Sequence, residues 1–267
     1  MVQAPTLVVF DSGLGGLTVH REIAKARPDA ALVYVADDAF FPYGAHDEAE
    51  LTRRVVTLMQ GLIAAHRPDL VVIACNTAST LVLPQLRARF TVPFVGTVPA
   101  IKPACAASLS KRVSVLGTQA TVAREYTRAL IRDFANGSDV TLVGSAALAP
   151  LAEAQLRGEP VQDGAIAREL APCFVEADGR RTDTIVLACT HYPLLIDRFT
   201  RLARWRVSFI DPAPAIARRV LALLGRPHAN QPAAPARIAF TSGQPPSPAL
   251  TASLHCFGIG ELAAGAV

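Results

Sequence analysis

The sequence predicts an α/β protein built from two similar lobes, each a mostly parallel sheet flanked by helices. Two observations lead to this prediction. Short apolar runs rich in β-branched residues alternate with segments of helical period, which is typical of parallel sheets with helices on both faces. In addition, the order of motifs in the first part of the chain recurs in a later part.

The predicted elements follow one another in regular alternation. The predicted strands are residues 6–10, 31–36, 70–74, 93–96, 113–117, 141–144, 184–188 and 207–210. The helix-period segments are residues 17–26, 48–66, 121–134 and 164–174. The tail at 227–248, rich in Pro, Ala and Ser, is predicted to be an irregular linker with one short strand at 237–241.

The internal repeat is clearest around two cysteines. Residues 7–13 form a strand that runs into a Gly-rich turn, and residues 113–118 do the same later. Downstream of each, a strand ends in Ala-Cys and is followed by polar residues, at Cys75 and at Cys189. Because ligands bind at the carboxyl ends of strands in open α/β sheets, each lobe would present one cysteine to a ligand.

Composition and charge exclude several classes of protein. The 267 residues are 51% hydrophobic and 18% charged, which indicates a globular chain of one large or two modest domains. The net charge of +4 is mild and the arginines are scattered, so nucleic-acid binding has little support. The first ten residues indicate a strand rather than a signal peptide, and no apolar run could span a bilayer. We therefore expect a cytoplasmic protein without membrane contact, with reduced thiols.

Cys75 and Cys189 are the first candidates for chemistry. Each ends a buried strand before a polar turn that opens a helix, where free N–H groups and partial positive charge favour a thiolate. A pKa about one unit below the usual value of about 8.5 would make such a thiol a competent base. On position alone a structural role is as plausible for either, but their pairing favours chemistry. The other three cysteines are predicted to be small buried hydrophobic residues: Cys105, Cys173 and Cys256.

Asp11 and His191 are the natural helpers of the two thiols. Asp11 follows a wholly apolar strand, where an idle carboxylate would be costly to bury, so it could orient or deprotonate a thiol. It could equally cap the next helix. His191 lies two residues after Cys189 and titrates near physiological pH, although it could also be a hydrogen-bonded turn residue.

Two other functions stay open for these residues, a dinucleotide-binding protein and a metal hydrolase. Gly13 and Gly15 match the first glycines of a dinucleotide fingerprint, and an acidic pair at 37–38 follows the next strand, but Thr18 replaces the third glycine. The second alternative is a metal hydrolase, whose ligands would be Cys75, Cys189, His191 and Asp11.

The motif side chains around the cysteines are mostly neutral hydrogen-bonding groups. No Lys or Arg lies inside any motif, so pyridoxal phosphate chemistry, which needs a Schiff-base lysine, is not supported. Helix N-termini and turn N–H groups suit the carboxylates of a small zwitterion. The neutral motif side chains are Ser12, Asn76, Thr77, Thr118, Thr121 and Thr190.

Together these motifs resemble the glutamate racemase family, within the aspartate/glutamate racemase superfamily. In chain order they are Asp11-Ser12-Gly13-x-Gly15-Gly16, Pro42-Tyr43-Gly44, Ala74-Cys75-Asn76-Thr77-Ala78-Ser79, Gly117-Thr118-x-x-Thr121, Cys189-Thr190-His191-Tyr192-Pro193 and Asp211-Pro212. Each motif is weak by itself, but all of them in the family's order over most of the chain are highly specific. The opening D-S-G-x-G-G favours glutamate over aspartate, although a racemase for another small amino acid or a hydantoin-like substrate stays an alternative.

The resemblance implies an active site between two pseudo-symmetric lobes, with Cys75 and Cys189 on opposite sides of the α-carbon of glutamate. Cys75 would deprotonate D-glutamate and Cys189 L-glutamate, assisted by Asp11 and His191 respectively, while the other thiol delivers a proton. No metal or organic cofactor is implied, and D-glutamate would feed peptidoglycan synthesis. The implied substrate-binding residues are Ser12, Pro42, Tyr43, Gly44, Asn76, Thr77, Thr118, Thr121 and Thr190.

The chain departs from the family at a few positions. Residues 149–153 match poorly the family's Cys-Pro-x-Phe-Val-Pro-Leu-Val-Glu segment, on which Glu153 would be an acidic helper of the second lobe. His46 stands where the family often has a basic residue, and Pro84 would kink the helix after Cys75. The predicted lobes are residues 1–98 with 208–267, and residues 99–207, and a homodimer is possible.

Overall fold

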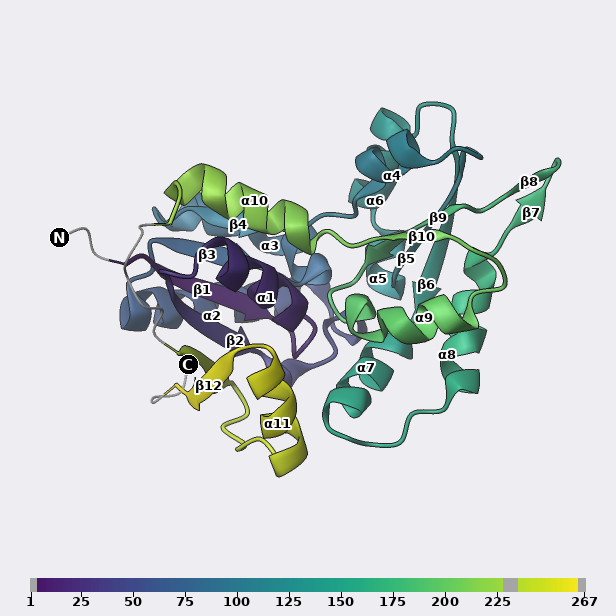
Figure 1. Ribbon diagram of the computed structural model, residues 1–267. Helices are drawn as coiled ribbons and strands as arrows, with labels where there is room; N and C mark the ends of the chain where they lie inside the picture. The colour runs from purple at the N-terminus through teal and green to yellow at the C-terminus, as the bar shows by residue number, and fades with distance from the viewer. Residues whose placement is uncertain (1–3, 228–234, 264–267) are drawn as a thin grey trace.

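The computed structural model of the chain describes residues 4–227 and 235–263, and two parallel sheets lie side by side in it (Figure 1). Sheet A has the spatial order β12 (Ile259–Leu262), β11 (Ala236–Phe240), β2 (Ala31–Ala36), β1 (Thr6–Asp11), β3 (Leu70–Ile73) and β4 (Phe94–Gly96). Sheet B has the order β10 (Ser208–Ile210), β9 (Thr184–Ala188), β5 (Arg112–Thr118) and β6 (Asp139–Ser145). The predicted fold class is confirmed.

The internal repeat of the sequence corresponds to a shared arrangement of four strands. The order β2-β1-β3-β4 in sheet A matches the order β6-β5-β9-β10 in sheet B, with all neighbours parallel. Asp11 ends β1 and Cys75 follows β3, whereas Thr118 ends β5 and Cys189 follows β9. The two cysteines therefore occupy equivalent places in two related sheets.

Both faces of sheet A are buried, because consecutive apolar side chains in a strand point to opposite sides. Leu7 and Val9 of β1 pack into one core, and Val8 and Phe10 pack into the other. The helices on the first face are α1 (Leu17–Ala26), α10 (Ala213–Leu224) and α11 (Pro248–Cys256). Those on the second face are α2 (Glu48–His66) and α3 (Asn76–Arg89).

Sheet B is covered in the same way. Leu116 and Leu187 pack against one group of helices, and Val115 and Val186 pack against another. The first group is α7 (Leu148–Leu156), α8 (Asp163–Leu170) and α9 (Ile196–Leu202), and the second is α4 (Ile101–Ala107) and α6 (Glu125–Phe134). The remaining short elements are α5 (Gln119–Ala123), η1 (Asp38–Phe40), η2 (Tyr43–Ala45), η3 (Ala171–Cys173), η4 (Tyr192–Leu195) and the hairpin of β7 (Glu176–Ala177) and β8 (Arg180–Arg181).

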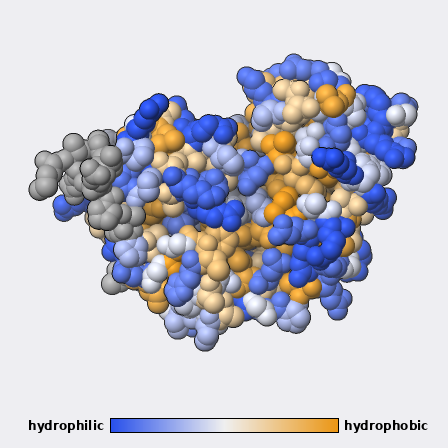
Figure 2. All heavy atoms as spheres, in the orientation of Figure 1, coloured by the Kyte–Doolittle hydropathy of each residue, from blue (hydrophilic) through white to orange (hydrophobic). Residues whose placement is uncertain are grey.

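The chain passes between the two sheets twice. It leaves sheet A after β4 and returns to it with α10, which packs against α1. The predicted return at residue 208 is wrong by one strand, because β10 extends the parallel ladder of sheet B by pairing with β9. We call sheet A with its helices the first lobe and sheet B with its helices the second lobe. Both crossings line a hollow of about 460 Å³ between α4 and α10, on the face shown in Figure 2.

Most predicted strands and helices occur within two residues of their predicted ends. The predicted helix at 121–134 is instead two helices, because the backbone of Arg124 is extended (φ −71°, ψ 142°) between α5 and α6. The predicted kink at Pro84 does not end α3, which continues to Arg89. No helix among residues 4–227 and 235–263 is long and apolar enough to cross a membrane.

The C-terminal tail differs from the prediction most. The expected strand is present as β11, but α11 and β12 were not predicted, and residues 228–234 of the expected linker lie outside the described part of the chain. Cys105 and Cys173 are buried as expected, whereas Cys256 is exposed. The reason is that α11 buries Leu250 and Leu254, and a residue two positions beyond Leu254 lies on the opposite side of a helix.

Candidate active site

Cys75 and Cys189 line one small cavity between the two lobes. Cys75 caps the N-terminus of α3 immediately after β3, and Cys189 follows β9. Both side chains are almost completely buried. The cavity thus joins the carboxyl ends of equivalent strands from both sheets. The predicted substrate-binding residues that line it are Ser12, Pro42, Tyr43, Gly44, Asn76, Thr77, Thr118 and Thr190.

The cavity leaves a space of about 20 Å³ between its lining residues, which is room for roughly one water molecule. Asn76 is 2% exposed, and neither its amide nitrogen nor its amide oxygen has a hydrogen-bond partner among the residues that the structure describes. An unpaired buried amide is costly, so this side chain indicates a polar ligand in the cavity. Any ligand larger than water requires the lobes to separate or the lining side chains to turn.

The second lobe supplies a chain of three side chains from thiol to carboxylate. His191 Nδ1 lies 3.8 Å from the Sγ of Cys189, and His191 Nε2 lies 3.0 Å from Glu153 Oε1. Glu153 lies on α7, and its other oxygen accepts a hydrogen bond from Arg157 at 3.1 Å. The structure therefore brings Glu153 into contact with His191. Glu153 is the residue that the sequence suggested as an acidic helper, on a segment that matches the family poorly.

This arrangement favours a charged imidazolium. Burial by itself would lower the pKa of His191, but the contacts with Cys189 and Glu153 outweigh burial and hold that pKa well above its usual value. Burial raises the pKa of Glu153, but His191, the Leu14 N–H and Arg157 together hold it below its usual value. The pair thus places a cationic hydrogen-bond donor beside the sulfur of Cys189.

Asp11 lies at the junction of the lobes. It is fully buried, and its carboxylate accepts hydrogen bonds from Thr190 Oγ1 (3.1 Å) and from the Gly13 N–H (3.2 Å). Burial raises the pKa of Asp11, although the charge of His191 opposes this. The N-cap position of α1 is Gly16, and the Asp11 carboxylate also accepts a hydrogen bond from the Gly16 N–H. Asp11 therefore contacts both the start of α1 and Thr190 of the second lobe.

The Cys75 thiol is harder to ionise than the sequence suggested. Burial, with the negative charge of Asp11 as a second cause, raises the pKa of Cys75 to about 12, and hydrogen bonds from Ser12 and the Ala78 N–H only partly oppose this. The prediction that the N-terminus of the following helix lowers this pKa is wrong for the closed cavity, because loss of water outweighs the favourable dipole.

The Gly-rich turn is a point of close approach between the lobes. The Leu14 N–H donates to Glu153 Oε1 at 2.6 Å. A Cβ on Gly15 would collide with the ring of His191, and a Cβ on Gly13 would collide with the carboxylate of Glu153. The side chains of the second lobe occupy the place that a pyrophosphate takes in a dinucleotide-binding turn. An N–H group of the turn does bind a carboxylate, but that carboxylate is the side chain of Glu153.

The acidic pair after β2 is also engaged within the protein. Asp37 accepts hydrogen bonds from Tyr43 Oη (2.6 Å), Thr241 Oγ1 (2.6 Å) and Arg54 Nε (2.7 Å). Asp38 accepts a hydrogen bond from the backbone N–H at position 242 (2.9 Å). The pair therefore fixes the wall of the cavity at Tyr43 and is not free to bind a ribose.

Some predicted residues lie outside the cavity. Thr121 does not line it, but its hydroxyl lies 2.9 Å from that of Thr118 and 3.3 Å from that of Thr77, so it supports two residues that do. His46 stacks on Phe40, with 3.6 Å between ring centroids, and is not a cavity residue. In the described part of the chain, no three His, Cys, Asp or Glu side chains are placed to hold a metal ion.

The sequence also missed residues of the site. Phe41 and Ala149 line the cavity, and the ring centroid of Phe41 lies 5.4 Å from that of His191. Phe41 could have been found because it directly precedes Pro42 in a motif already assigned to the cavity. Arg124, which contacts the backbone of Thr77, gave no sequence signal.

The cavity thus presents one thiol from each of two related lobes. The Asp/Glu/Hydantoin racemase family model matches residues 17–220, and the chain belongs to this family. Within it, the chain groups with the glutamate racemases, so the predicted resemblance is confirmed and the chain is an amino-acid racemase, an isomerase.

The relatives are similar over nearly their whole length. The glutamate racemase of Brucella anthropi is 57% identical over 219 residues, covering 82% of this chain and 79% of that protein. That of Sinorhizobium medicae is 53% identical over 241 residues, covering 90% and 89%. The solved Escherichia coli glutamate racemase, in complex with L-glutamate and the activator UDP-MurNAc-ala, is 39% identical with a TM-score of 0.88 and 97% coverage of both chains. The Thermus thermophilus enzyme, in complex with β-chloro-D-alanine, is 27% identical with a TM-score of 0.72, covering 99% and 98%.

Proposed function

We propose that this chain interconverts L- and D-glutamate by transferring protons between the α-carbon and two cysteines. The observation that carries the proposal is the joint presence of Cys75 and Cys189 in one cavity, each at the end of an equivalent strand. The similar glutamate racemases, which cover most of the chain, support glutamate as the substrate. The expected division into two lobes gives each face of the substrate its own thiol.

The reaction needs one base and one acid at a time. For L-glutamate, the Cys189 thiolate takes the α-proton while the Cys75 thiol gives its proton to the opposite face of the carbon. One C–H bond breaks as an S–H bond forms on one face, and the reverse occurs on the other face, so nothing is oxidised or reduced. The Cys75 thiol, protonated in the closed cavity because its pKa is about 12, is ready for this acid role.

The reverse direction requires Cys75 to lose its proton first. Asp11, whose charge acts on Cys75, is the candidate to accept it, because burial raises the pKa of this carboxyl and makes it a stronger base. His191, held in its charged form by Glu153, can then supply the proton that Cys189 delivers. The two thiols thus have different partners, a carboxylate in the first lobe and an imidazolium in the second.

Substrate binding falls to the neutral groups that line the cavity. The N-termini of α3 and α5 both open onto it, through Asn76 and Thr118, and helix N-termini attract carboxylates. The unpaired amide of Asn76 can both donate to a carboxylate and accept from an ammonium group. Ser12, Thr77 and Thr190 add hydroxyl groups from both lobes.

The product D-glutamate would serve peptidoglycan synthesis. The activator in the E. coli complex, UDP-MurNAc-ala, carries N-acetylmuramic acid, which is a sugar of peptidoglycan.

The test is solvent deuterium incorporation by purified, metal-free protein. L- or D-glutamate in D₂O should racemise and gain one deuterium at the α-carbon, because a thiol exchanges its proton with solvent. Circular dichroism follows the inversion, and NMR follows the loss of the α-proton signal. Inert glutamate together with inverted aspartate would show that the substrate assignment is wrong. Product that inverts without any deuterium would contradict thiol-mediated proton transfer.

A further inference from the structure

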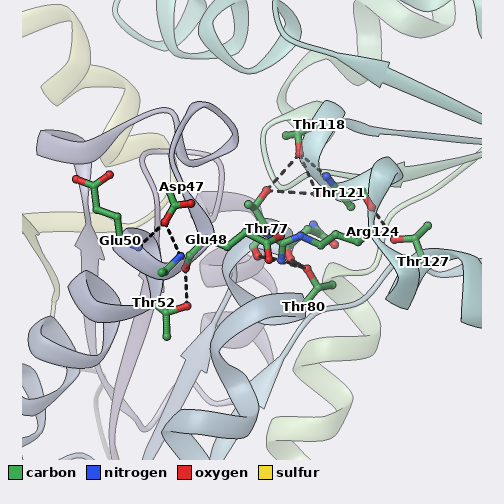
Figure 3. A network of polar contacts seen from close by, with 12 residues as sticks. Asp47, Glu48, Glu50, Thr52, Thr77, Thr80, Thr118, Thr121, Arg124 and Thr127 are labelled. Atoms are coloured by element: carbon green, nitrogen blue, oxygen red, sulfur yellow. Dashed lines mark hydrogen bonds and ion pairs between the residues drawn. The ribbon is translucent and has the colours of Figure 1, made fainter.

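Arg124 joins the two lobes at the edge of the cavity. It belongs to the second lobe, and it is the extended residue between α5 and α6. Its Nη1 donates to the backbone oxygen of Thr77 and to Thr80 Oγ1, both at 2.9 Å, and both residues lie on α3 in the first lobe. Its Nη2 lies 3.3 Å from Glu48 at the start of α2. Figure 3 shows these contacts meeting at a single guanidinium.

The break between α5 and α6 allows this reach. An unbroken helix would carry the Arg124 side chain around the helix surface, whereas the extended backbone frees it to cross to α3. The break is stabilised locally, because Thr127 Oγ1 donates to the Thr121 oxygen at 2.7 Å and the Thr127 N–H donates to the Arg124 oxygen at 3.1 Å. The interruption of the helix thus places the cationic side chain of Arg124 between the two lobes.

The contact is shielded from solvent. The Arg124 side chain is only 10% exposed, so its hydrogen bonds to Thr77 and Thr80 are worth more than a surface ion pair. The contact with Glu48 differs, because that carboxylate is 65% exposed and its attraction is screened. The two hydrogen bonds to α3 are therefore more important than the ion pair with Glu48.

Thr77 connects this contact to the reacting groups. Its hydroxyl lies 3.2 Å from that of Thr118, which belongs to the second lobe, and both line the cavity. Thr77 is also only two residues from Cys75. We propose that Arg124 is a positioning residue that latches α3 to the second lobe and thereby holds Thr77 and Thr118 against the substrate in the closed cavity.

This inference rests on the proposed function, because the latch acts on glutamate binding. The cavity must open to admit a ligand larger than water, and a latch between the lobes stabilises the closed state. Loss of the latch should weaken substrate binding, whereas the thiols and their partners stay intact once the cavity is closed. A role in folding alone would instead reduce the amount of active enzyme without changing KM.

The test compares Arg124→Gln with Arg128→Gln, a matched change four residues later, on α6, in an arginine that is 57% exposed and whose ion pair in the described part of the chain is with Glu125, at 4.0 Å. We expect Arg124→Gln to raise KM for both enantiomers about tenfold, with kcat within about threefold of wild type. Arg128→Gln should leave both constants within about twofold. Glu48→Gln should also have a small effect, because its contact is exposed.

A second measurement does not depend on turnover. The rise in Tm that D-glutamate causes in the wild type should be largely lost in Arg124→Gln and kept in Arg128→Gln. Thr80→Val, which removes one of the two acceptors, should fall between them. An Arg124→Gln variant with unchanged KM and an unchanged ligand-induced Tm shift would overturn the latch while the racemase function stands. A wild type that neither racemises nor binds glutamate would overturn both.

Discussion

His191 lies between a carboxylate and a thiol, with Nε2 3.0 Å from Glu153 Oε1 and Nδ1 3.8 Å from the Sγ of Cys189. Among the described residues, no imidazole is a cause of the Cys75 pKa, which burial and the negative charges of Asp11 and Cys189 raise. The two halves of a duplicated scaffold therefore present the same thiol with different partners. This asymmetry makes the two directions of the reaction separable by experiment.

Replacing Glu153 with Gln should impair the half-reaction at Cys189 more than that at Cys75. The neutral amide no longer holds His191 in its charged form, so kcat/KM should fall about 10- to 100-fold. The fall must be equal for both enantiomers, since their equilibrium constant is one. The α-deuterium isotope effect should rise more for L-glutamate, whose proton Cys189 removes in the proposed mechanism. The exposed Glu159→Gln is the control, and equal isotope effects for both enantiomers would refute the assignment of His191 and Glu153 to Cys189.

Each cysteine of the pair should be essential by itself. Cys75→Ala and Cys189→Ala should each abolish racemisation, because one face of the α-carbon then lacks its acid or base. Each variant should still release halide from a β-halogenated substrate in one configuration, Cys75→Ala from the L form and Cys189→Ala from the D form. The exposed Cys256→Ala should retain full activity. Complete racemisation by either alanine variant is incompatible with a two-base mechanism.

Gly15→Ala should disable the site without unfolding the protein. The added Cβ would collide with the ring of His191 and the hydroxyl of Thr190, so His191 or the whole lobe must move. We expect kcat/KM to fall at least about 100-fold, since small misplacements of catalytic groups have effects of this size. Gly61→Ala is the matched control, because nothing lies within 4 Å of its Cβ, and it should stabilise α2 by about 0.5–1 kcal/mol. Normal activity in Gly15→Ala would show that this close approach is not needed.

The pair of thiols could be predicted because strand ends leave a mark in the sequence. A buried apolar run followed by Ala-Cys and polar residues fixes the position of a cysteine at a sheet edge, and its repetition indicates two such edges. The presence of two parallel sheets was predictable for the same reason, because their strands are such apolar runs. The strand β10, Ser208–Ile210, was assigned to the wrong lobe because so short a run does not show which sheet it joins, and only its pairing with β9 places it in sheet B.

Long-range contacts and burial were not predictable. Arg124 meets Thr77, which is 47 residues away, through a helix break that no Gly or Pro announces. The direction of the pKa shift of Cys75 depends on how much water the two lobes exclude from the thiol. No local sequence pattern records this. The role of Glu153 was a weak inference from position, whereas its contact with His191 follows from the packing of α7 against η4.

Arg27→Met should destabilise the first lobe strongly. Arg27 is 2% exposed, pairs with the equally buried Asp29 at 2.8 Å, and donates to the carbonyls of Leu224 and Gly225 at the end of α10. Removal of one partner of a buried pair costs roughly 3–5 kcal/mol, because the other charge stays buried. Urea unfolding should show this loss, whereas Arg53→Met on the exposed side of α2 should change stability by less than about 0.5 kcal/mol. A similar small change in both variants would mean that Arg27 does not fix the returning helix.

His20 should make the protein sensitive to acid. It is fully buried against Tyr34, and burial lowers its pKa to about 4, although a hydrogen bond with the backbone of Phe257 partly opposes this. A group with a lowered pKa resists protonation in the folded state, so its contribution is complete above the unfolded value of about 6.5 and is lost as the pH falls through 4. Between pH 7 and pH 5 this change is about 2 kcal/mol of unfolding free energy. His20→Leu, which cannot be protonated, should therefore lose less stability over this interval than the wild type, as measured by urea unfolding at each pH. Parallel losses in the two proteins would show that His20 does not drive the acid sensitivity.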